Sequence, residues 1–396
     1  MRRLNFNKIN KLILCAFLSF TLILGNITIV KADGIELNCK SAILVDAISG
    51  EVIVDKNSHE KLPPASVTKI MTMLLVMEAI DSGKITFEDK VTISKQAESA
   101  STEGTRLLLE AGEVRTVHEL MLGVAVESAN DASIALAEYI SGSEEEFVKL
   151  MNKRAKELGM NDTNFMNANG LHEDGHVTSA YDIALMSRAL LKHEKIFDYI
   201  SQYIVEVKIG KNNDVLRSLA NKNKMVRFYQ GFVDGIKTGY TRQALYCISV
   251  TAKKNNLRLI SVIMGAPDVP TRTKEAKKLL DYGFANYSNY SVAKSGDVVA
   301  EAPVSKGDTS NLRIVSKDDI SILIKKGEDK NITKEIKIPD VLVAPIKKDQ
   351  QLGEMILYKD KKEIAKFPLV ASSDINKSSF FINLRKSLEY WFGASK

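Results

Sequence analysis

The chain has 396 residues, of which 45% are hydrophobic and 26% are charged, and its formal net charge is +6. This length allows two domains with a substantial core, whereas three cysteines are too few for a disulfide framework. Five basic residues and no acidic residue lie within residues 1–32, so the remaining chain has a net charge of +1 and no basic patch that would indicate nucleic-acid binding. Cys39 and Cys247 follow this segment, and they either form one disulfide or stay free and buried.

Residues 1–32 have the pattern of a secretory signal peptide. Basic residues come first, residues 12–24 form an apolar stretch, and Ala32 stands where a signal peptidase would cut. We expect cleavage after Ala32 and export of the mature chain. The alternative is an uncleaved anchor, because residues 12–30 are nearly long enough to span a bilayer.

Residues 42–47 and 51–55 are rich in β-branched side chains and are joined by a short turn, which predicts a hairpin. A proline pair then halts the extended chain, and the apolar run that follows predicts a helix that begins at Ser66. A spacing of three places the Ser66 hydroxyl and the Lys69 amine on one face of this helix. An amine in a desolvated site can take a hydroxyl proton, so Ser66 is a candidate acyl-transfer nucleophile.

The Ser-x-x-Lys spacing is weak support by itself. It recurs at Ser58 and Lys61 and again at Ser291 and Lys294. A solvated helix start carries the same residue types. The interpretation therefore depends on the clusters that follow later in the chain.

Residues 117–140 have the apolar periodicity of a helix, with one interruption at residues 127–131. This interruption would expose the short side chains of Ser128 and Asn130 in the wall of a cleft. His172 and His176 lie further on, in a segment rich in asparagine and glycine that predicts a loop. A spacing of four does not bring two imidazoles together in a loop, so we expect no metal site there.

Residues 233–239, 246–252 and 257–264 predict three consecutive strands, with a polar turn between the last two. Lys237, Thr238 and Gly239 close the first strand. A cation and a hydroxyl beside a glycine suit a wall along which a substrate backbone lies and an anionic terminus is held. The alternative is an ordinary turn.

Three clusters therefore occur in order: residues 66–69, 128–130 and 237–239. Together they form the signature of serine β-lactamases and penicillin-binding proteins. Beyond the clusters, the chain resembles the low-molecular-mass penicillin-binding D-alanyl-D-alanine carboxypeptidases, serine peptidases that trim peptidoglycan stem peptides. The resemblance extends through residues 165–171 and 282–284 and covers nearly the whole chain after residue 32. It implies an α/β (α+β) penicillin-binding fold in which helices pack on an antiparallel sheet.

The resemblance also implies a set of site residues. The catalytic residues would be Ser66, Lys69, Ser128 and Asn130. The substrate-binding residues would be Lys237, Thr238, Gly239, Tyr240 and Arg272. No metal and no organic cofactor is implied.

These residues would share the steps of an acyl transfer. Ser66 would attack the carbonyl of the penultimate D-alanine, with Lys69 as the base, and water would then hydrolyse the acyl-enzyme. Ser128 and Asn130 would pass a proton to the leaving amine and hold the substrate amide. β-Lactams would acylate the same serine, because they imitate the D-alanyl-D-alanine end.

The remaining residues would bind the negatively charged groups of the substrate. Lys237 and Thr238 would face the terminal carboxylate together with Arg272, for which a solvated charge at a helix start is the alternative. The backbone N–H groups of Ser66 and Tyr240 would form the oxyanion hole, where the loss of one donor lowers the rate on the order of 10² to 10³.

Two positions depart from the family pattern. Ala129 stands where many members have glycine, which exchanges one small residue for another. Leu245 stands where a glycine is usual, so the packing beside the active-site strand is in question.

We expect four segments: a signal peptide (1–32), a serine peptidase domain (33–287), a β-rich domain (288–370) and a linker with an amphipathic helix (371–396). Short β-branched runs between residues 297 and 358 predict the strands of the β-rich domain, which is a spacer in the family. Apolar residues recur at helical spacing over residues 380–392, with basic residues beside them, which predicts a helix in the surface of an anionic membrane. The alternative is a helix docked on the β-rich domain.

Two other functions share part of this pattern. A β-lactamase has all three clusters, but neither the β-rich domain nor the terminal helix has a purpose in a freely secreted hydrolase. A catalytically idle peptidoglycan-binding scaffold is disfavoured because every named chemical group is present. We expect a carboxypeptidase that acts on D-alanyl-D-alanine stem peptides, binds β-lactams and lies peripherally on the outer face of the cytoplasmic membrane.

Overall fold

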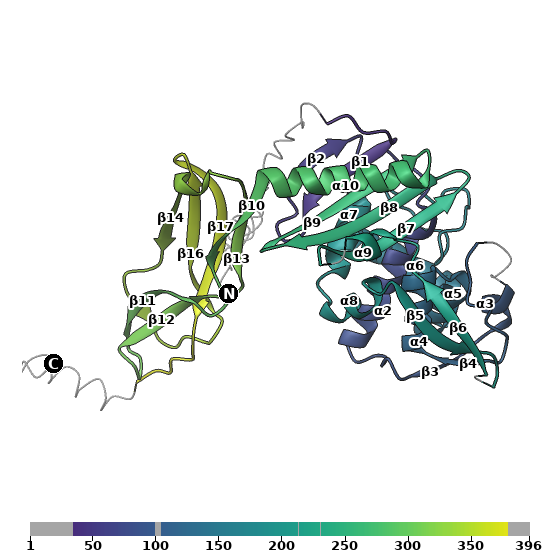
Figure 1. Cartoon of the computed structure of the whole chain (residues 1–396). Helices are drawn as coiled ribbons and strands as arrows, with labels where there is room; N and C mark the ends of the chain where they lie inside the picture. Colours follow the sequence, from purple (N-terminus) through teal and green to yellow (C-terminus); the bar gives the residue numbers. More distant parts are fainter. Residues whose placement is uncertain (1–34, 100–103, 213, 230, 379–396) are drawn as a thin grey trace, which may run out of the picture.

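The computed structural model describes residues 35–99, 104–212, 214–229 and 231–378. The chain forms two domains, and the long helix α10 (Val269–Asn286) of the first leads directly into strand β10 (Tyr287–Ala293) of the second (Figure 1). The predicted signal peptide and the predicted membrane helix lie outside the described residues. Among the described residues, no helix has the length and apolar character needed to cross a bilayer.

The first domain is built on a five-stranded antiparallel sheet. In spatial order its strands are β2 (Val52–Lys56), β1 (Ser41–Asp46), β9 (Leu257–Ala266), β8 (Leu245–Lys254) and β7 (Val233–Thr241). The pairing of β1 with β2 confirms the predicted hairpin, and the β7–β8–β9 ladder confirms the three predicted strands. Leu245 has a φ of 58°, a conformation that favours glycine, in agreement with the glycine expected at this position from the family pattern.

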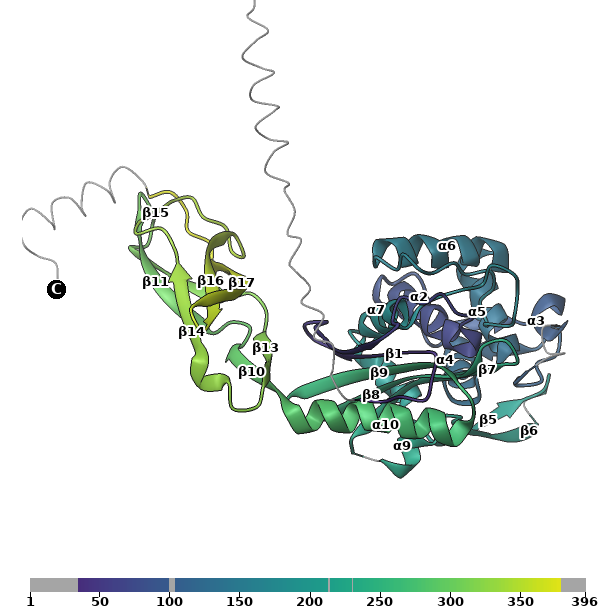
Figure 2. The ribbon, with the colours of Figure 1, turned by 90° about the horizontal axis from the view of Figure 1, so that it is seen from above.

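Helices cover both faces of the sheet, with α10 on one face and the other main helices on the opposite face (Figure 2). The helical elements of this domain are η1 (Ala65–Thr68), α2 (Lys69–Asp81), α3 (Lys95–Ser99), α4 (Val117–Leu122), η3 (Gly123–Glu127), α5 (Asn130–Ser141), α6 (Glu144–Glu157), α7 (Ala180–Leu190), η4 (Glu194–Ile196), α8 (Phe197–Ile200), α9 (Met225–Phe228) and α10. The domain also contains two short antiparallel ladders. Strand β3 (Lys90–Thr92) pairs with β4 (Val114–Thr116), and β5 (Ile204–Ile209) pairs with β6 (Val215–Ala220).

Helix α2 is the centre of the helical layer. Ten of its thirteen residues are buried, because apolar side chains occur all around it rather than on one face. The predicted interrupted helix is also confirmed. Helix α4 continues into the π-helical turn η3, Ser128 follows in the left-handed conformation, and α5 begins at Asn130.

The start of α2 corrects the prediction of a helix that begins with Ser66 as its cap. Residues Ala65–Thr68 form the 3-10 turn η1, and α2 begins only at Lys69. Ala65 has a φ of 51°, so the chain turns tightly after the proline pair and its first turn is wound more tightly than an α-helix. The Ser66 hydroxyl caps neither element and lies against the Lys69 amine instead.

The second domain is β-rich. Its strands are β10, β11 (Val298–Ser305), β12 (Asn311–Ser316), β13 (Ile320–Lys325), β14 (Ile332–Lys337), β15 (Leu342–Val343), β16 (Gln351–Lys359) and β17 (Lys362–Ala371), with a short helical turn η5 (Asp329–Asn331). Six of them form one sheet in the order β14-β16-β17-β12-β11-β15, while β10 pairs with β13. The five runs that predicted strands are strands here, whereas β10, β15 and β17 were not predicted. This domain has a hydrophobic core of its own.

Candidate active site

The Lys69 amine lies against the Ser66 hydroxyl. Its Nζ donates to Ser66 Oγ at 3.1 Å, to Asn130 Oδ1 at 2.7 Å and to the backbone oxygen of Asn169 at 2.6 Å. These three contacts hold the amine in one place. The ammonium can donate to all three oxygens, and after it loses one proton its lone pair can accept from the Ser66 hydroxyl. The tight η1 turn therefore brings the candidate nucleophile and the candidate base into direct contact.

The environment of Lys69 favours its neutral form. The side chain has no solvent-exposed surface. Burial lowers the pKa of the amine well below its ordinary value of 10.5, the Lys237 cation lowers it further, and Asp131 acts in the opposite direction. A neutral amine is the form that can accept the proton of the Ser66 hydroxyl.

The turn that carries Ser128 is held by hydrogen bonds to a segment that comes about twenty residues earlier in the sequence. Ser128 has a φ of 68°. Its backbone oxygen accepts a hydrogen bond from Thr105 Oγ1 at 3.0 Å, and the Asn130 N–H donates to the Thr105 oxygen at 2.8 Å. The Asp131 carboxylate accepts from the backbone N–H of Leu107 at 3.0 Å. These bonds fix a strained turn whose side chains face the cavity.

Strand β7 runs directly beside the nucleophile. A Cβ atom placed on Gly239 would lie 3.0 Å from the backbone nitrogen of Ser66 and 3.1 Å from the Pro64 oxygen. A side chain at this position would push the strand away from η1. Glycine here lets the backbone of β7 pass close to that of Ser66.

Lys237 lies in the middle of β7 and is buried, with 2% of its surface exposed. Burial lowers the pKa of its amine to about 7, and the cations Arg272 and Lys222 lower it in the same direction, while Glu127 opposes them. Its Nζ donates to the backbone oxygen of Thr238 at 3.2 Å.

A cavity of about 550 Å³ opens beside these groups. The predicted site residues that line it are Ser66, Ser128, Asn130, Thr238, Gly239, Tyr240 and Arg272. The other two, Lys69 and Lys237, are buried beneath this lining. Nine residues from distant parts of the sequence, between Ser66 and Arg272, therefore meet at one cavity.

Arg272 is not a solvated surface charge. It lies in the first turns of α10, is 6% exposed and lines the cavity. Its Nε has no hydrogen-bond partner within the described part of the chain. A buried guanidinium donor without a partner, at the wall of a cavity, is positioned to bind an anion.

The segment that contains Asn169 and Gly170 was not predicted to belong to the site. Its contribution is made by the backbone, since the Asn169 oxygen accepts from Lys69, and the preceding Ala168 oxygen accepts from Thr72 Oγ1 at 2.6 Å. Gly170 has a φ of +84°, and a Cβ atom there would lie 2.0 Å from the Ala65 oxygen. The resemblance over residues 165–171 was the signal that pointed to this segment.

Lys222 and Glu127 are also part of the site, although neither was predicted to belong to it. Lys222 lines the cavity, and its Nζ donates to Glu127 Oε1 at 2.8 Å. Glu127 ends η3, immediately before Ser128. This ion pair joins the two walls of the cavity, one from the Ser128 turn and one from the segment after β6.

The contacts of His176 are structural and are not those of a metal ligand. Its Nε2 is 2.9 Å from Thr68 Oγ1, and its Nδ1 accepts from the Met166 backbone N–H at 3.3 Å. The ring therefore ties the 165–176 loop to the residue before Lys69. Among the described residues, no group of three or more histidine, cysteine, aspartate or glutamate side chains is arranged to hold a metal ion.

A family model for D-alanyl-D-alanine carboxypeptidases matches residues 27–268, and a model for the C-terminal domain of penicillin-binding protein 5 matches residues 287–377. The chain belongs to the serine-type D-alanyl-D-alanine carboxypeptidases. The family expected from the three clusters is thus confirmed, and so is the penicillin-binding fold with its β-rich second domain.

Similar proteins cover both domains of this carboxypeptidase. The chain is 47% identical over 353 residues to the D-alanyl-D-alanine carboxypeptidase DacF of Bacillus subtilis, which covers 89% of this chain and 90% of that one. It is similar to penicillin-binding protein 5 of Haemophilus influenzae, with a TM-score of 0.74, 32% identity and coverage of 87% and 99%. It also resembles PBP3 of Streptococcus pneumoniae, with a TM-score of 0.72, 26% identity and coverage of 86% and 100%.

Proposed function

We propose that Ser66 is the nucleophile that removes the terminal D-alanine from peptidoglycan stem peptides. The observation that carries this proposal is the 3.1 Å contact between Ser66 Oγ and a buried Lys69 amine with a lowered pKa. Lys69 takes the hydroxyl proton as Oγ bonds to the carbonyl carbon of the penultimate D-alanine. The C–N bond then breaks, and D-alanine leaves after its nitrogen receives a proton through Ser128. Water hydrolyses the resulting ester and regenerates Ser66.

The backbone N–H groups of Ser66 and Tyr240 stabilise the negative charge on the carbonyl oxygen during both steps. The close approach of Gly239 to the Ser66 nitrogen supports this assignment, because β7 then passes directly beside the backbone of Ser66. Asn130 accepts from Lys69 through its Oδ1 and lines the cavity beside Ser66, which supports its role in holding the substrate backbone.

The terminal carboxylate of the peptide binds between β7 and the start of α10. Thr238 and Arg272 line this part of the cavity, and Lys237 supplies a second cation beneath them. The unpartnered Nε of Arg272 supports this assignment. β-Lactams carry a carboxylate and an activated amide in the same relative positions, so they acylate Ser66 as well.

The Ser66→Ala variant tests this function. Release of D-alanine from a soluble D-alanyl-D-alanine pentapeptide and covalent labelling by a fluorescent penicillin should both disappear, while the melting temperature stays within a few degrees of wild type. Labelling that survives in this variant would place the nucleophile elsewhere. A wild-type enzyme that turns over penicillin faster than the pentapeptide would favour a β-lactamase.

We also propose that the enzyme works on the outer face of the cytoplasmic membrane. The pattern of residues 1–32 supports export. Residues 380–392 place aromatic and aliphatic side chains at helical spacing beside basic ones, which supports a helix that lies in the surface of an anionic membrane.

A further inference from the structure

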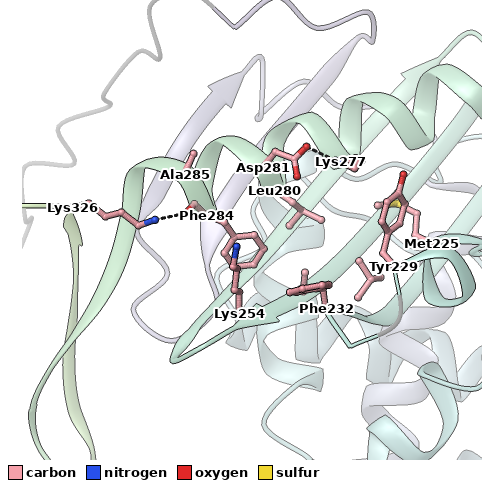
Figure 3. Close-up of a pocket in the computed structure, with 12 residues that line it drawn as sticks. Met225, Tyr229, Phe232, Lys254, Lys277, Leu280, Asp281, Phe284, Ala285 and Lys326 are labelled. Atoms are coloured by element: carbon pink, nitrogen blue, oxygen red, sulfur yellow. Dashed lines mark hydrogen bonds and ion pairs between the residues drawn. The ribbon is translucent and has the colours of Figure 1, made fainter.

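A second hollow lies under helix α10, apart from the catalytic cavity. Figure 3 shows it between α10 and the segment that leads from α9 into β7. Its volume is about 440 Å³, and the rings of Tyr229, Phe232 and Phe284 form much of its wall. Phe228 and Phe232 are 64% and 51% exposed, and they are the exposed phenylalanines of the described residues. Exposed aromatic rings around a hollow are typical of binding surfaces.

This hollow continues toward the catalytic cavity. An adjoining stretch of about 560 Å³ shares Tyr229, Lys277 and Asp281 with it, and shares Lys224 and Val269 with the catalytic cavity. Helix α10 has 18 residues, so this surface follows it for about 27 Å at the usual rise per residue. We name the hollow and the adjoining stretch together the α9–α10 groove.

The α9–α10 groove is cationic. Its lining includes one acidic residue, Asp281, which is paired with Lys277. Its lysines are Lys224, Lys254, Lys274, Lys277, Lys278 and Lys326. The Lys277 amine lies 5.5 Å from the Tyr229 ring centre, and the Lys254 amine lies 6.0 Å from that of Phe232. The groove therefore offers positive charges and aromatic faces side by side.

We propose that the α9–α10 groove binds an anionic segment of polymeric peptidoglycan next to the stem peptide that reacts. This inference rests on the proposed function. Stem peptides carry free carboxylates that pair with lysines, and the sugar rings of the glycan present apolar C–H faces that suit exposed aromatic rings. A polymer would thus contact the enzyme at two places, the catalytic cavity and the groove, which raises its effective affinity.

The position of the groove decides which part of the polymer it takes. It begins at Val269, three residues before Arg272 on α10, and so at the end of the cavity assigned to the terminal carboxylate. A linear stem peptide ends at that carboxylate. The groove therefore receives a neighbouring chain of the wall, and a short soluble peptide does not reach it.

The charge of the groove disfavours the chain's own terminal segment as its occupant. Residues 379–396 include Arg385, Lys386 and Lys396 but one acidic residue, Glu389, so they would repel the lysines. An anionic bilayer has the required charge, but it is a broad surface, whereas the aromatic rings here enclose a hollow. A polymer of extended, acidic chains fits both the charge and the shape.

Two variants and one control test the proposal. Phe228→Ser removes an exposed ring and Lys274→Glu reverses a charge, and both residues line the groove but not the catalytic cavity. Lys153→Glu is the control, because Lys153 is an exposed lysine, with 73% of its side chain accessible, on α6, on the opposite side of the domain (Figure 2). Each full-length protein is measured for co-sedimentation with purified sacculi, for D-alanine release from sacculi, and for D-alanine release from a soluble pentapeptide.

We expect both groove variants to sediment with sacculi about tenfold more weakly and to release D-alanine from sacculi correspondingly more slowly, as for loss of one well-placed contact. Release from the soluble pentapeptide should equal wild type, and the control should equal wild type in all three assays. Sacculi binding that is unchanged in both variants overturns the proposal. A wild-type enzyme inactive on the soluble pentapeptide would instead refute the proposed function, while sedimentation still reports on the groove.

Discussion

At the scale of single residues, two buried amines with lowered pKa values govern the proposed chemistry. Lys69 must be neutral to take the Ser66 proton, and burial favours that state. Lys237 must be charged to attract a carboxylate, although burial lowers the pKa of its amine to about 7. The charge of Lys237 helps to keep Lys69 neutral, because a nearby cation lowers the pKa of the Lys69 amine further.

We expect kcat/KM for a soluble pentapeptide to follow a bell-shaped pH profile. It rises with pH as Lys69 loses its proton and becomes a base, and it falls above about pH 7 as Lys237 loses the charge that attracts the substrate. Initial rates of D-alanine release across this range measure both limbs. An analogue with an amidated terminus should lack the falling limb, because it has no carboxylate for the charged Lys237 to attract.

The Lys237→Arg variant is the control for this profile. A guanidinium keeps its charge above pH 7, so the falling limb should move to higher pH even if the rate at its maximum drops. If the falling limb stays in place in this variant, or is equally present with the amidated analogue, Lys237 does not have the assigned role.

We expect His176 to make the stability of the folded chain depend on pH. Burial lowers the pKa of its imidazole to about 4, and Nδ1 already accepts a hydrogen bond, so a second proton has no room there. The unfolded chain binds that proton below about pH 6.5, and the folded chain does so only near pH 4. As pH falls through this window, the free energy of unfolding should decrease by about 3 kcal/mol from this residue.

Urea unfolding of wild type and of His176→Gln between pH 7 and pH 4 measures this contribution. Carboxylates titrate in both proteins, so the difference between the two curves isolates the histidine. We expect wild type to lose stability more steeply than the variant. Parallel curves would mean that the imidazole is protonated in the folded state.

At the scale of elements, the η1 turn depends on the loop that packs against it. The Asn169 oxygen holds Lys69, and His176 holds Thr68, so residues 165–176 position the C-terminal end of the turn. Gly170 has no room for a side chain beside Ala65. The loop therefore fixes the backbone of the proposed nucleophile.

Gly170→Ala should lower both stability and acylation. The new methyl group would overlap the Ala65 oxygen, and the positive φ would be strained, so we expect a loss of roughly 1–3 kcal/mol in the free energy of unfolding. Displacement of Ser66 should slow labelling by a fluorescent penicillin on the order of 10²-fold. Chemical unfolding and stopped-time labelling measure these two effects.

Gly112→Ala is the matched control for this variant. Gly112 has a φ of +83°, but no atom lies within 4 Å of its Cβ position. Backbone strain should lower the free energy of unfolding of Gly112→Ala, but labelling by a fluorescent penicillin should not be slower than in wild type. Equal labelling rates in the two variants would mean that contact with η1 does not position Ser66.

At the scale of the whole molecule, the terminal segment is expected to act apart from the two domains. A chain that ends at Lys377 should release D-alanine from soluble substrate at the wild-type rate but should no longer bind vesicles that contain anionic lipid, since the membrane contact is assigned to residues 378–396. Flotation with vesicles measures the binding. A truncated chain that stays bound, or whose melting temperature falls by several degrees, would favour a helix docked on the protein instead.

The sequence alone determined the local elements and the order of the clusters. Runs of β-branched and apolar residues marked β7, β8 and β9, and polar residues in an apolar run marked the break at Ser128, because these signals depend on near neighbours. Strands β10, β15 and β17 were missed. Strand β15 has two residues, β10 has polar side chains among its apolar ones, and β17 has polar side chains and a proline.

Only the tertiary structure decided which groups surround the reacting atoms. The Asn169 oxygen that holds Lys69 is a backbone atom one hundred residues away, and a backbone carbonyl has no residue signature. The burial of Arg272 and Lys237, on which their pKa values depend, comes from the packing of α10 and β7 against the rest of the domain. The tight η1 turn in place of a capped helix likewise follows from contacts with Gly239 and Gly170, which no local pattern around Ser66 contains.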